Sequence, residues 1–449
     1  LITILICAGV FLGVIRSQLE IDKNKYVCET SCTFDARIVS SPEIKNEYQV
    51  FKVHAITTDD SVYDIQIRLP LYPKYHIGEM VRLSGKVSEP RIIFPHGDKR
   101  AFDYVSYLET NNVGSEMIFP QVKIISNEAN SLTTILARWK EYMVGKIDMN
   151  VSSPESSLAS GMLFGATSMS KELLQTFRVA GLSHIIVLSG FNIAILITAI
   201  LFVFTFLPLF VRVFFAGGVT VLFVMMVGGE ASVIRATFMA FIALLATVLG
   251  REYVARQALV ISFFCIIFYE PQALLHDVSL HLSFLATAGI VYLVSPLTSL
   301  FKNVFPKVTS DSFRELSVTT CAAYFATLPY SMYTFGSISV YALLANVLVL
   351  PFVSAAMLLT FFVVVFSYVS DSIATLFGYV DSVLIGVMIW IAEMIASLPG
   401  ASFLLSISFT TMCSMYILFV LIAIYFYKKM NDETRVTKIN GNLTDIISY

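Results

Sequence analysis

Polar residues inside apolar stretches of the chain are the ones whose types and spacing could do chemistry. Polar and ionisable groups are costly inside a bilayer, so they usually face a pathway or a protein partner. An arginine could contact an anion such as phosphate, hydroxyls and amides could line a hydrogen-bonding path, and a serine with a histidine could form a nucleophile. The candidates are His184, Ser189, Gly190, Asn192, Ser232, Arg235, Asp277, His281, Ser283 and Asn346.

Helical spacing would bring some of these side chains onto common faces. At about 100° per residue, His184, Ser189 and Asn192 fall within about 140° of one another and form one broad polar face. Asp277 and His281 are four residues apart and share a face as well. The same residue types also pack membrane helices together through hydrogen bonds and close approach. The interpretation as path lining and the interpretation as helix packing therefore both stay open.

Catalysis by a serine is a second hypothesis, and the sequence favours it less. Ser189 followed by Gly190 superficially resembles a membrane serine protease, with a histidine such as His281 as its base. However, Val187 stands two residues before the serine, where a glycine is expected, and no oxyanion-hole donor is evident. We therefore expect a protein that is not an enzyme and that holds no cofactor and no metal ion.

The composition indicates a membrane protein. Of the 449 residues, 56% are hydrophobic and 14% are charged, and the mean hydropathy is +0.75. Soluble domains have a smaller apolar share and a larger charged share. The formal net charge of −2 gives no bulk affinity for nucleic acid or for an anionic bilayer.

Apolar stretches of spanning length predict a polytopic α-helical fold with about nine to ten spans, some of them broken. The stretch 338–368 is too long for one straight crossing and contains Pro351, which indicates a kink or a break. Asp381 and Glu393 must face protein, water or an interface rather than lipid. The candidate spans are 183–207, 211–228, 231–249, 256–270, 281–298, 316–334, 338–368, 374–397 and 403–427.

The loop charges predict the orientation of these spans. Short cytoplasmic loops carry an excess of Lys and Arg. Counted from an external start, the loops around Gly228, Glu270, Gly336 and Pro399 should face outward, and they contain no Lys or Arg. The inward loops contain Arg212, Arg251, Arg256, Lys302, Lys307, Arg314, Lys428 and Lys429. We therefore expect a multi-pass protein of the cytoplasmic (inner) membrane with its C-terminus inside.

The N-terminal part of the chain has a different pattern of apolar and polar residues. Residues 1–16 form an apolar run that we interpret as a first transmembrane helix, truncated in this sequence, with a signal peptide as the alternative. Residues 26–127 contain short alternating runs bounded by turn-forming residues, typical of a small external β-barrel of the OB type. Such a barrel could contact nucleic acid or serve as a structural or partner-binding module. The predicted strands are Thr33–Val39, Tyr48–Ile56, Val62–Leu69, Met80–Val87 and Glu116–Ile125.

Cys28 and Cys32 lie in this external region, where a disulfide can persist. Four extended residues span more than the Cα separation that a disulfide allows. The pair can close only if Glu29 to Ser31 form a turn or bulge, so a disulfide and two free thiols remain alternatives.

An amphipathic helix is predicted over 131–149, ahead of the transmembrane region 154–427. Trp139 and Tyr142 suit the headgroup region, so we interpret this helix as interfacial. The alternative is an ordinary helix packed against the barrel. Residues 430–449 are interpreted as a polar cytoplasmic tail.

Taken in order, the polar clusters resemble those of the ComEC family of DNA-uptake proteins, and the resemblance covers nearly the whole chain. Each motif is weak alone, but their order is fairly specific. The matching motifs are Phe102-Asp103-Tyr104 with Tyr107-Leu108, His184 with Ser189-Gly190, Ser232 with Arg235-Ala236, Asp277 with Leu282-Ser283, and Asn346 with Pro351. The resemblance implies a channel for single-stranded DNA in natural transformation, with Arg235 as a phosphate contact and Ser189, Asn192 and Asn346 as lining residues.

The sequence departs from that family in three ways. Asn192 stands where the family commonly has His, and His281 where it commonly has Gln. Many members also carry a metallo-β-lactamase-like nuclease domain, whereas no His-x-His-x-Asp-His cluster occurs here. We therefore expect a separate nuclease as a partner. No Gly-x-x-x-x-Gly-Lys-Ser/Thr loop occurs either, so the energy would come from a cytoplasmic motor or a gradient. A small-solute or lipid transporter on the same fold remains the alternative function.

Overall fold

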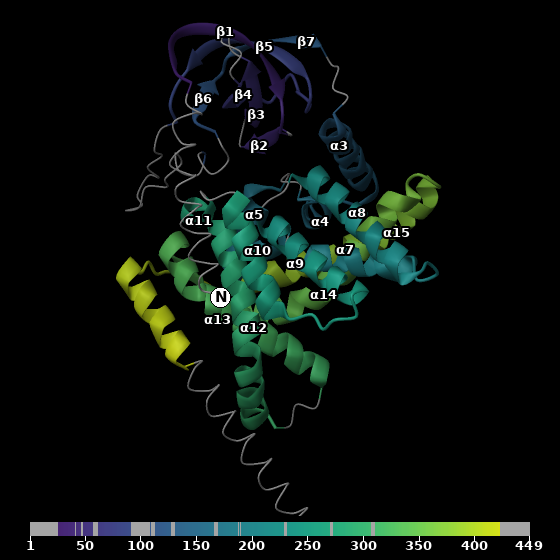
Figure 1. Ribbon diagram of the computed structural model, residues 1–449, viewed down its shortest axis with the longest axis vertical. Coiled ribbons are helices and arrows are strands. Elements are labelled where there is room, and N and C mark those ends of the chain that lie inside the picture. Colours follow the sequence, from purple (N-terminus) through teal and green to yellow (C-terminus); the bar gives the residue numbers. More distant parts are fainter. Residues whose placement is uncertain are drawn as a thin grey trace, which may run out of the picture. The chain divides into compact units, whose positions relative to one another are not determined.

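The computed structural model describes residues 26–40, 42–45, 48–56, 62–90, 108, 113–126, 131–165, 169–186, 188, 190–228, 231–269, 273–306 and 310–422 (Figure 1). The predicted first helix and the C-terminal tail lie outside the described residues. The chain forms two compact units. The first contains residues up to 171 together with 184–280 and 352–389, and the second contains 172–183, 281–351 and the residues from 390 onward.

The first unit begins with a mixed β-sheet whose strands follow the order β6-β4-β3-β1-β5-β7, with β2 pairing with β3. Neighbours in this order are antiparallel except β4 and β6, which are parallel. A bridge between Ser88 and Glu116 joins the end of β5 to β6. The strands are β1 (Cys28–Ile38), β2 (Glu43–Lys45), β3 (Tyr48–Ile56), β4 (Val62–Pro70), β5 (Met80–Val87), β6 (Ser115–Ile118) and β7 (Gln121–Ser126).

Alternation of buried and partly exposed side chains explains why these segments are strands. In β4, Ile65, Ile67 and Leu69 point into the apolar core of the sheet, and their neighbours are less buried. The run predicted as one strand over Glu116–Ile125 is two strands instead. Phe119 has a φ of 50°, and Pro120 lacks the amide proton that a continuing ladder requires.

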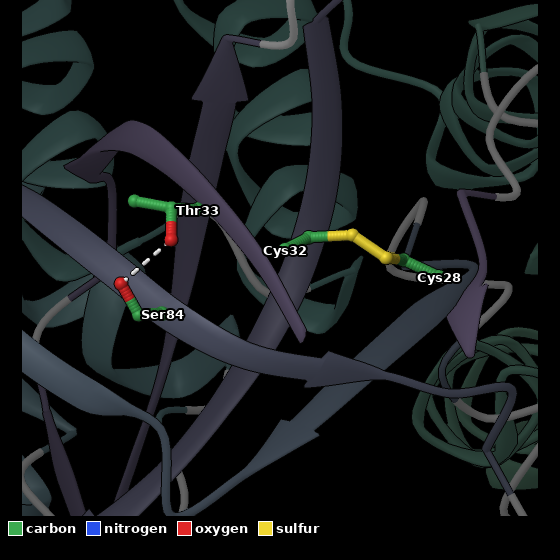
Figure 2. Close-up of a disulfide and its surroundings, with 4 residues drawn as sticks. All are labelled: Cys28, Cys32, Thr33 and Ser84. Atoms are coloured by element: carbon green, nitrogen blue, oxygen red, sulfur yellow. Dashed lines mark hydrogen bonds between the residues drawn. A yellow bond between two sulfur atoms is a disulfide. The ribbon is translucent and has the colours of Figure 1, made fainter. Parts of the chain in front are cut away.

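Cys28 and Cys32 form a disulfide within β1, with their Cα atoms 6.4 Å apart (Figure 2). The pairing with β5 shifts between them: Cys28 lies opposite Val87, and Cys32 lies opposite Gly85. The four-residue step on β1 therefore matches a two-residue step on β5, and this bulge brings the two cysteines within reach of each other. Just beyond it, the hydroxyls of Thr33 and Ser84 hydrogen-bond at 2.9 Å.

On the outer face of the sheet, Arg82 of β5 donates two hydrogen bonds to the carboxylate of Asp35 of β1, at 2.7 and 2.9 Å. The bond from Arg82 lowers the pKa of Asp35. Both side chains are substantially exposed, so the pair contributes little to stability.

Helix α3 (Leu132–Asn150) has one broad apolar face, of which one side is buried and the other is exposed. One side is buried, with Leu136, Met143 and Ile147 among its residues, and the helix contacts α4 (Glu155–Phe164) and α8 (Leu209–Val227). The other carries a stripe that is at least half exposed: Leu132, Ile135, Trp139 and Tyr142. An exposed aromatic and aliphatic stripe on a surface helix is the feature expected of a helix lying in a membrane interface.

The remaining described elements are mainly helices. Four described helices are long and apolar enough to cross a membrane, namely α8, α12, α14 and α15, and several others are shorter apolar helices. The other elements and their bounds are α5 (Lys171–Ala180), α6 (Ser183–Ile186), α7 (Gly190–Val203), α9 (Ala231–Val248), α10 (Ala255–Tyr269), α11 (Ala273–His276), α12 (Val278–Val304), α13 (Asp311–Phe335), β8 (Ser337–Ser339), α14 (Ala342–Phe366), α15 (Asp371–Ala396), β9 (Ser402–Leu404) and the helix Phe409–Ile422.

Two of the predicted spans differ from the structure in an informative way. The stretch 183–207 comprises α6 and α7, which are separate helices. The stretch 338–368 begins with the end of β8, and α14 starts only at Ala342, which leaves 25 residues for the helix. Pro351 lies inside α14 without ending it.

In the second unit, α12 and α13 approach closely through small residues. A Cβ on Gly289 would lie 2.5 Å from the carbonyl oxygen of Ala322 and 2.5 Å from Cβ of Ala326. Small residues at such a contact let two membrane helices approach closely. Strands β8 and β9 pair beside Gly336, whose φ of 62° ends α13.

We expect Gly378→Ala to destabilise the first unit. A Cβ at Gly378 of α15 would lie 2.1 Å from the carbonyl oxygen of Asn150 at the end of α3. Because a backbone atom cannot rotate away, the helix must shift, at a cost of about 1–3 kcal/mol. Gly386→Ala on the same helix is the matched control, since its Cβ would meet only Glu155 Oε1 at 3.5 Å. The melting temperature in detergent should fall for Gly378→Ala and stay unchanged for Gly386→Ala. Equal melting temperatures of the two variants would contradict the close contact.

Candidate functional site

The first turns of α7 and α9 bring together four of the predicted site residues: Gly190, Asn192, Ser232 and Arg235. Helix α9 packs against α7 and α8 in the first unit (Figure 1). Side chains from α7, α8 and α9 share one apolar cluster, which includes Ile193, Val213 and Val233.

Ser232 ties the start of α9 to the segment that precedes α7. Its buried hydroxyl donates to the carbonyl oxygen of Leu188 at 3.1 Å. Leu188 is two residues before Gly190, the first residue of α7, and Ser232 is the second residue of α9. The N-terminal ends of the two helices therefore lie next to each other.

Asn192 ties the first turn of α7 to α4. Its buried side-chain amide donates to the carbonyl oxygen of Met162 at 2.9 Å. Two residues before Met162, the hydroxyl of Ser160 is buried and has no hydrogen-bond partner among the described atoms. The carbonyl groups of Leu188 and Met162 complete these contacts, and no sequence pattern could have pointed to them, because every residue has a carbonyl group.

Arg235 places a buried guanidinium at the same location. The residue is 7% exposed, and its Nη1 lies 3.4 Å from the sulfur of Met239 one turn later. Its Nη2 lies 3.2 Å from the position that a Cβ would take on Gly190. The guanidinium therefore sits against the first residue of α7.

Gly190 permits this arrangement because it has no side chain. A Cβ there would also lie 3.1 Å from Cβ of Ala236 on α9. Both distances are shorter than ordinary van der Waals contact, so α7 and α9 can approach this closely only at a glycine.

The other predicted site residues lie elsewhere. Asp277 accepts a bond from the backbone amide of Leu280 at 3.0 Å and so caps the start of α12. His184 is on α6 with an exposed side chain. Ser189 lies outside the described residues.

His281, Ser283 and Asn346 belong to the second unit. His281 Nδ1 and the Tyr330 hydroxyl are 2.6 Å apart, joining α12 to α13. The Asn346 amide donates to the carbonyl oxygen of Ala342 one turn earlier, at 2.8 Å, and its own buried oxygen has no partner among the described atoms. For His281, this contact matches the helix-packing interpretation.

The described groups of the α7–α9 site are suited to binding an anion. Unpaired amides at a helix N-terminus carry a partial positive charge and attract anions. Here two such termini, of α7 and α9, adjoin a guanidinium that stays charged under all ordinary conditions. In the part of the chain that the structure describes, no group of three or more His, Cys, Asp or Glu side chains could hold a metal ion.

Comparison with known proteins identifies the helical region. The family model described as "Competence protein" matches residues 162–430, which include the α7–α9 site. The chain is also similar to ComE operon protein 3 of Bacillus subtilis (strain 168), with 20% identity over 283 residues that cover 61% of this chain. The alignment covers 34% of that relative, so the chain spans about a third of its length. No solved structure matches the chain significantly.

Proposed function

Because the chain belongs to the competence protein family, we propose that it moves single-stranded DNA across the cytoplasmic membrane during natural transformation. The family match covers the membrane helices and the buried polar residues of the α7–α9 site. A strand crossing a bilayer needs a path whose groups replace water around its phosphates. The proposal assigns that role to this site.

The observation that carries this proposal is the meeting of Arg235 with the N-terminal ends of α7 and α9. A phosphodiester bears one negative charge, and a guanidinium with two helix N-termini offers positive charge in a fixed geometry. Transporter sites in membranes use helix N-termini in the same manner toward anionic groups. Asn192 and Ser232 hold the two helix ends in this geometry through their bonds to Met162 and Leu188.

We also propose that the N-terminal sheet is a barrel of the OB type. Strand β1 lies between β3 and β5, β4 pairs with β6 in parallel, and the Ser88–Glu116 bridge joins β5 to β6. These pairings link β6, β4, β3, β1 and β5 in a cycle, with β7 attached to β5, and a small closed barrel requires such a cycle. In this proposal the barrel stands outside the membrane, and a separate nuclease and a cytoplasmic motor act with the chain.

Deletion of the gene tests this function. Transformation should fall below detection while labelled double-stranded DNA still binds to the cell surface. Loss of surface binding to the same extent would place the protein before the membrane step and overturn the proposal. Undiminished transformation would overturn it as well.

Sidedness provides a separate prediction. From the loop charges we predict that the sheet lies outside and the end of α12 inside. An impermeant maleimide should label Lys86→Cys in intact cells and Lys302→Cys only after permeabilisation, since both lysines are exposed. Labelling of Lys302→Cys but not of Lys86→Cys in intact cells would show that the topology is the reverse of the predicted one.

Substitution of Ser189 distinguishes transport from hydrolysis. A serine nucleophile cannot be replaced, because its oxygen forms the covalent intermediate. A serine that lines a path or packs helices can be replaced by alanine, because alanine keeps the small volume and only one modest hydrogen bond is lost. We expect Ser189→Ala to keep most of the transformation frequency. Complete loss in a stably expressed variant, with labelling of the wild type by a fluorophosphonate, would favour the hydrolase.

A further inference from the structure

Asp381 is an acidic side chain buried between two membrane helices, and the transport site does not use it. It lies on α15, is 0% exposed, and faces α14. Its Oδ2 is 2.7 Å from the hydroxyl oxygen of Thr360. Its Oδ1 is buried and has no hydrogen-bond partner among the described atoms.

The helices that contain this pair provide no cation to balance a negative charge. Helix α14 contains no ionisable residue. The other ionisable residues of α15 are Asp371, Tyr379 and Glu393, and all three are exposed. None of the ion pairs in the described part of the chain includes Asp381.

The turn between α3 and α4 also packs along α15, and Glu155, the first residue of α4, approaches α15 with another acid. The backbone amide of Ser152 donates to the Ser382 hydroxyl at 3.1 Å, and Glu155 Oε1 lies 3.5 Å from the Cβ position of Gly386. On the last turns of α3, the Lys146 ammonium lies over the ring of Tyr142, 5.6 Å from its centroid. The surroundings therefore disfavour a carboxylate at Asp381.

The hydrogen bonds of Thr360 indicate where a proton would sit. Its oxygen lies 2.9 Å from the carbonyl oxygen of Ala356 and 2.7 Å from Asp381 Oδ2. A hydroxyl has one hydrogen, so it can donate to only one of these two acceptors. If Thr360 donates to Ala356, the short contact with Asp381 requires a proton on Oδ2, which then donates to Thr360.

We propose that Asp381 is a proton-binding site of the membrane domain. Its carboxyl is neutral in the folded protein, and it donates to Thr360 across the contact between α14 and α15. Loss of the proton leaves a charge that the site cannot solvate, so ionisation and loosening of the α14–α15 contact are linked. The inference concerns the proton and not the cargo, so it stands independently of the DNA-transport proposal.

Infrared spectroscopy of the purified full chain provides the first test. The wild type at neutral pH should show the carbonyl stretch of a protonated carboxyl, and Asp381→Asn should lose it. Asp371→Asn is the matched control, an exposed acid on the same helix, and it should keep the band. Thr360→Val should keep the band at a shifted frequency, because the acid loses its acceptor. Absence of an Asp381-dependent band would overturn the proposal.

The pH dependence of melting provides the second test. A carboxyl that is neutral when folded and ionises when unfolded makes the unfolded state bind fewer protons, so stability falls as the pH rises above about 4. The melting temperature of the wild type should therefore drop relative to Asp381→Asn between about pH 5 and pH 8. A difference that stays constant with pH, or that grows in favour of the wild type, would contradict a neutral Asp381.

Discussion

Arg235→Ala should lower the transformation frequency by about 10- to 150-fold, the factor that corresponds to a lost hydrogen bond to a charged group of about 1.5–3 kcal/mol. The physical reason is that the buried guanidinium lies against Gly190, where α7 and α9 meet. Membrane levels of each variant, measured in the same cells, separate lost transport from lost protein.

Two further variants decide what Arg235 does. Arg235→Lys keeps the charge but loses the planar fork of donors, so it should retain partial uptake at normal protein level. Arg256→Ala removes an exposed arginine at the start of neighbouring α10 and should leave uptake nearly unchanged. If Arg235→Lys lowers the amount of folded protein as much as Arg235→Ala does, Arg235 has a structural role. The predicted phosphate contact is then wrong.

Gly190→Leu should abolish uptake and lower the amount of folded protein. Its Cβ would already lie 3.1 Å from Cβ of Ala236 and 3.2 Å from Nη2 of Arg235, and the remaining carbons would push α9 and the guanidinium away. Overpacking of this kind costs about 1–3 kcal/mol. Gly190→Ala should give an intermediate effect, because a shift of a few tenths of an ångström can accommodate one carbon.

The matched control for Gly190 is Gly218→Leu on α8. Nothing lies within 4 Å of the Cβ position of Gly218, so a side chain there meets open space. Transformation frequency and membrane level should both stay near the wild type. Equal loss in the Gly190 and Gly218 variants would show that the apolar helices tolerate no larger residue in general, and the specific close approach of α7 and α9 would lose its support.

The sequence predicted three strands of the N-terminal region closely, because local patterns determine them, whereas β1 begins at Cys28 rather than at the predicted Thr33 and β2 was not predicted. Alternation and turn residues place β3, β4 and β5 within a residue of their observed bounds. The family resemblance drawn from the ordered polar clusters is confirmed by the family match over 162–430. The split at Phe119 could not be predicted from alternation, since only Pro120 marks it.

The contacts of the site could not be predicted to the same extent. Helical spacing assumed one continuous helix through 183–207, but α6 ends at Ile186 and α7 starts at Gly190, so a common face for His184 and Asn192 does not follow. The meeting of two helix N-termini at Arg235 depends on packing between α7 and α9, which lie far apart in sequence. The number of spans also stays a prediction. Hydropathy shows that a segment is long and apolar enough to cross a membrane, but not that it does cross.

Strand import into proteoliposomes tests the central claim most directly. The purified full chain would be reconstituted into vesicles that enclose a single-strand-binding protein as a trap. End-labelled single-stranded DNA would be added outside, and a nuclease would be added after the import period to degrade the DNA that remains outside. We predict that nuclease-resistant DNA accumulates in proportion to the wild-type protein, and that Arg235→Ala vesicles accumulate far less. Accumulation no greater than in protein-free vesicles, while a small solute passes freely, would contradict DNA transport and favour a small-solute transporter.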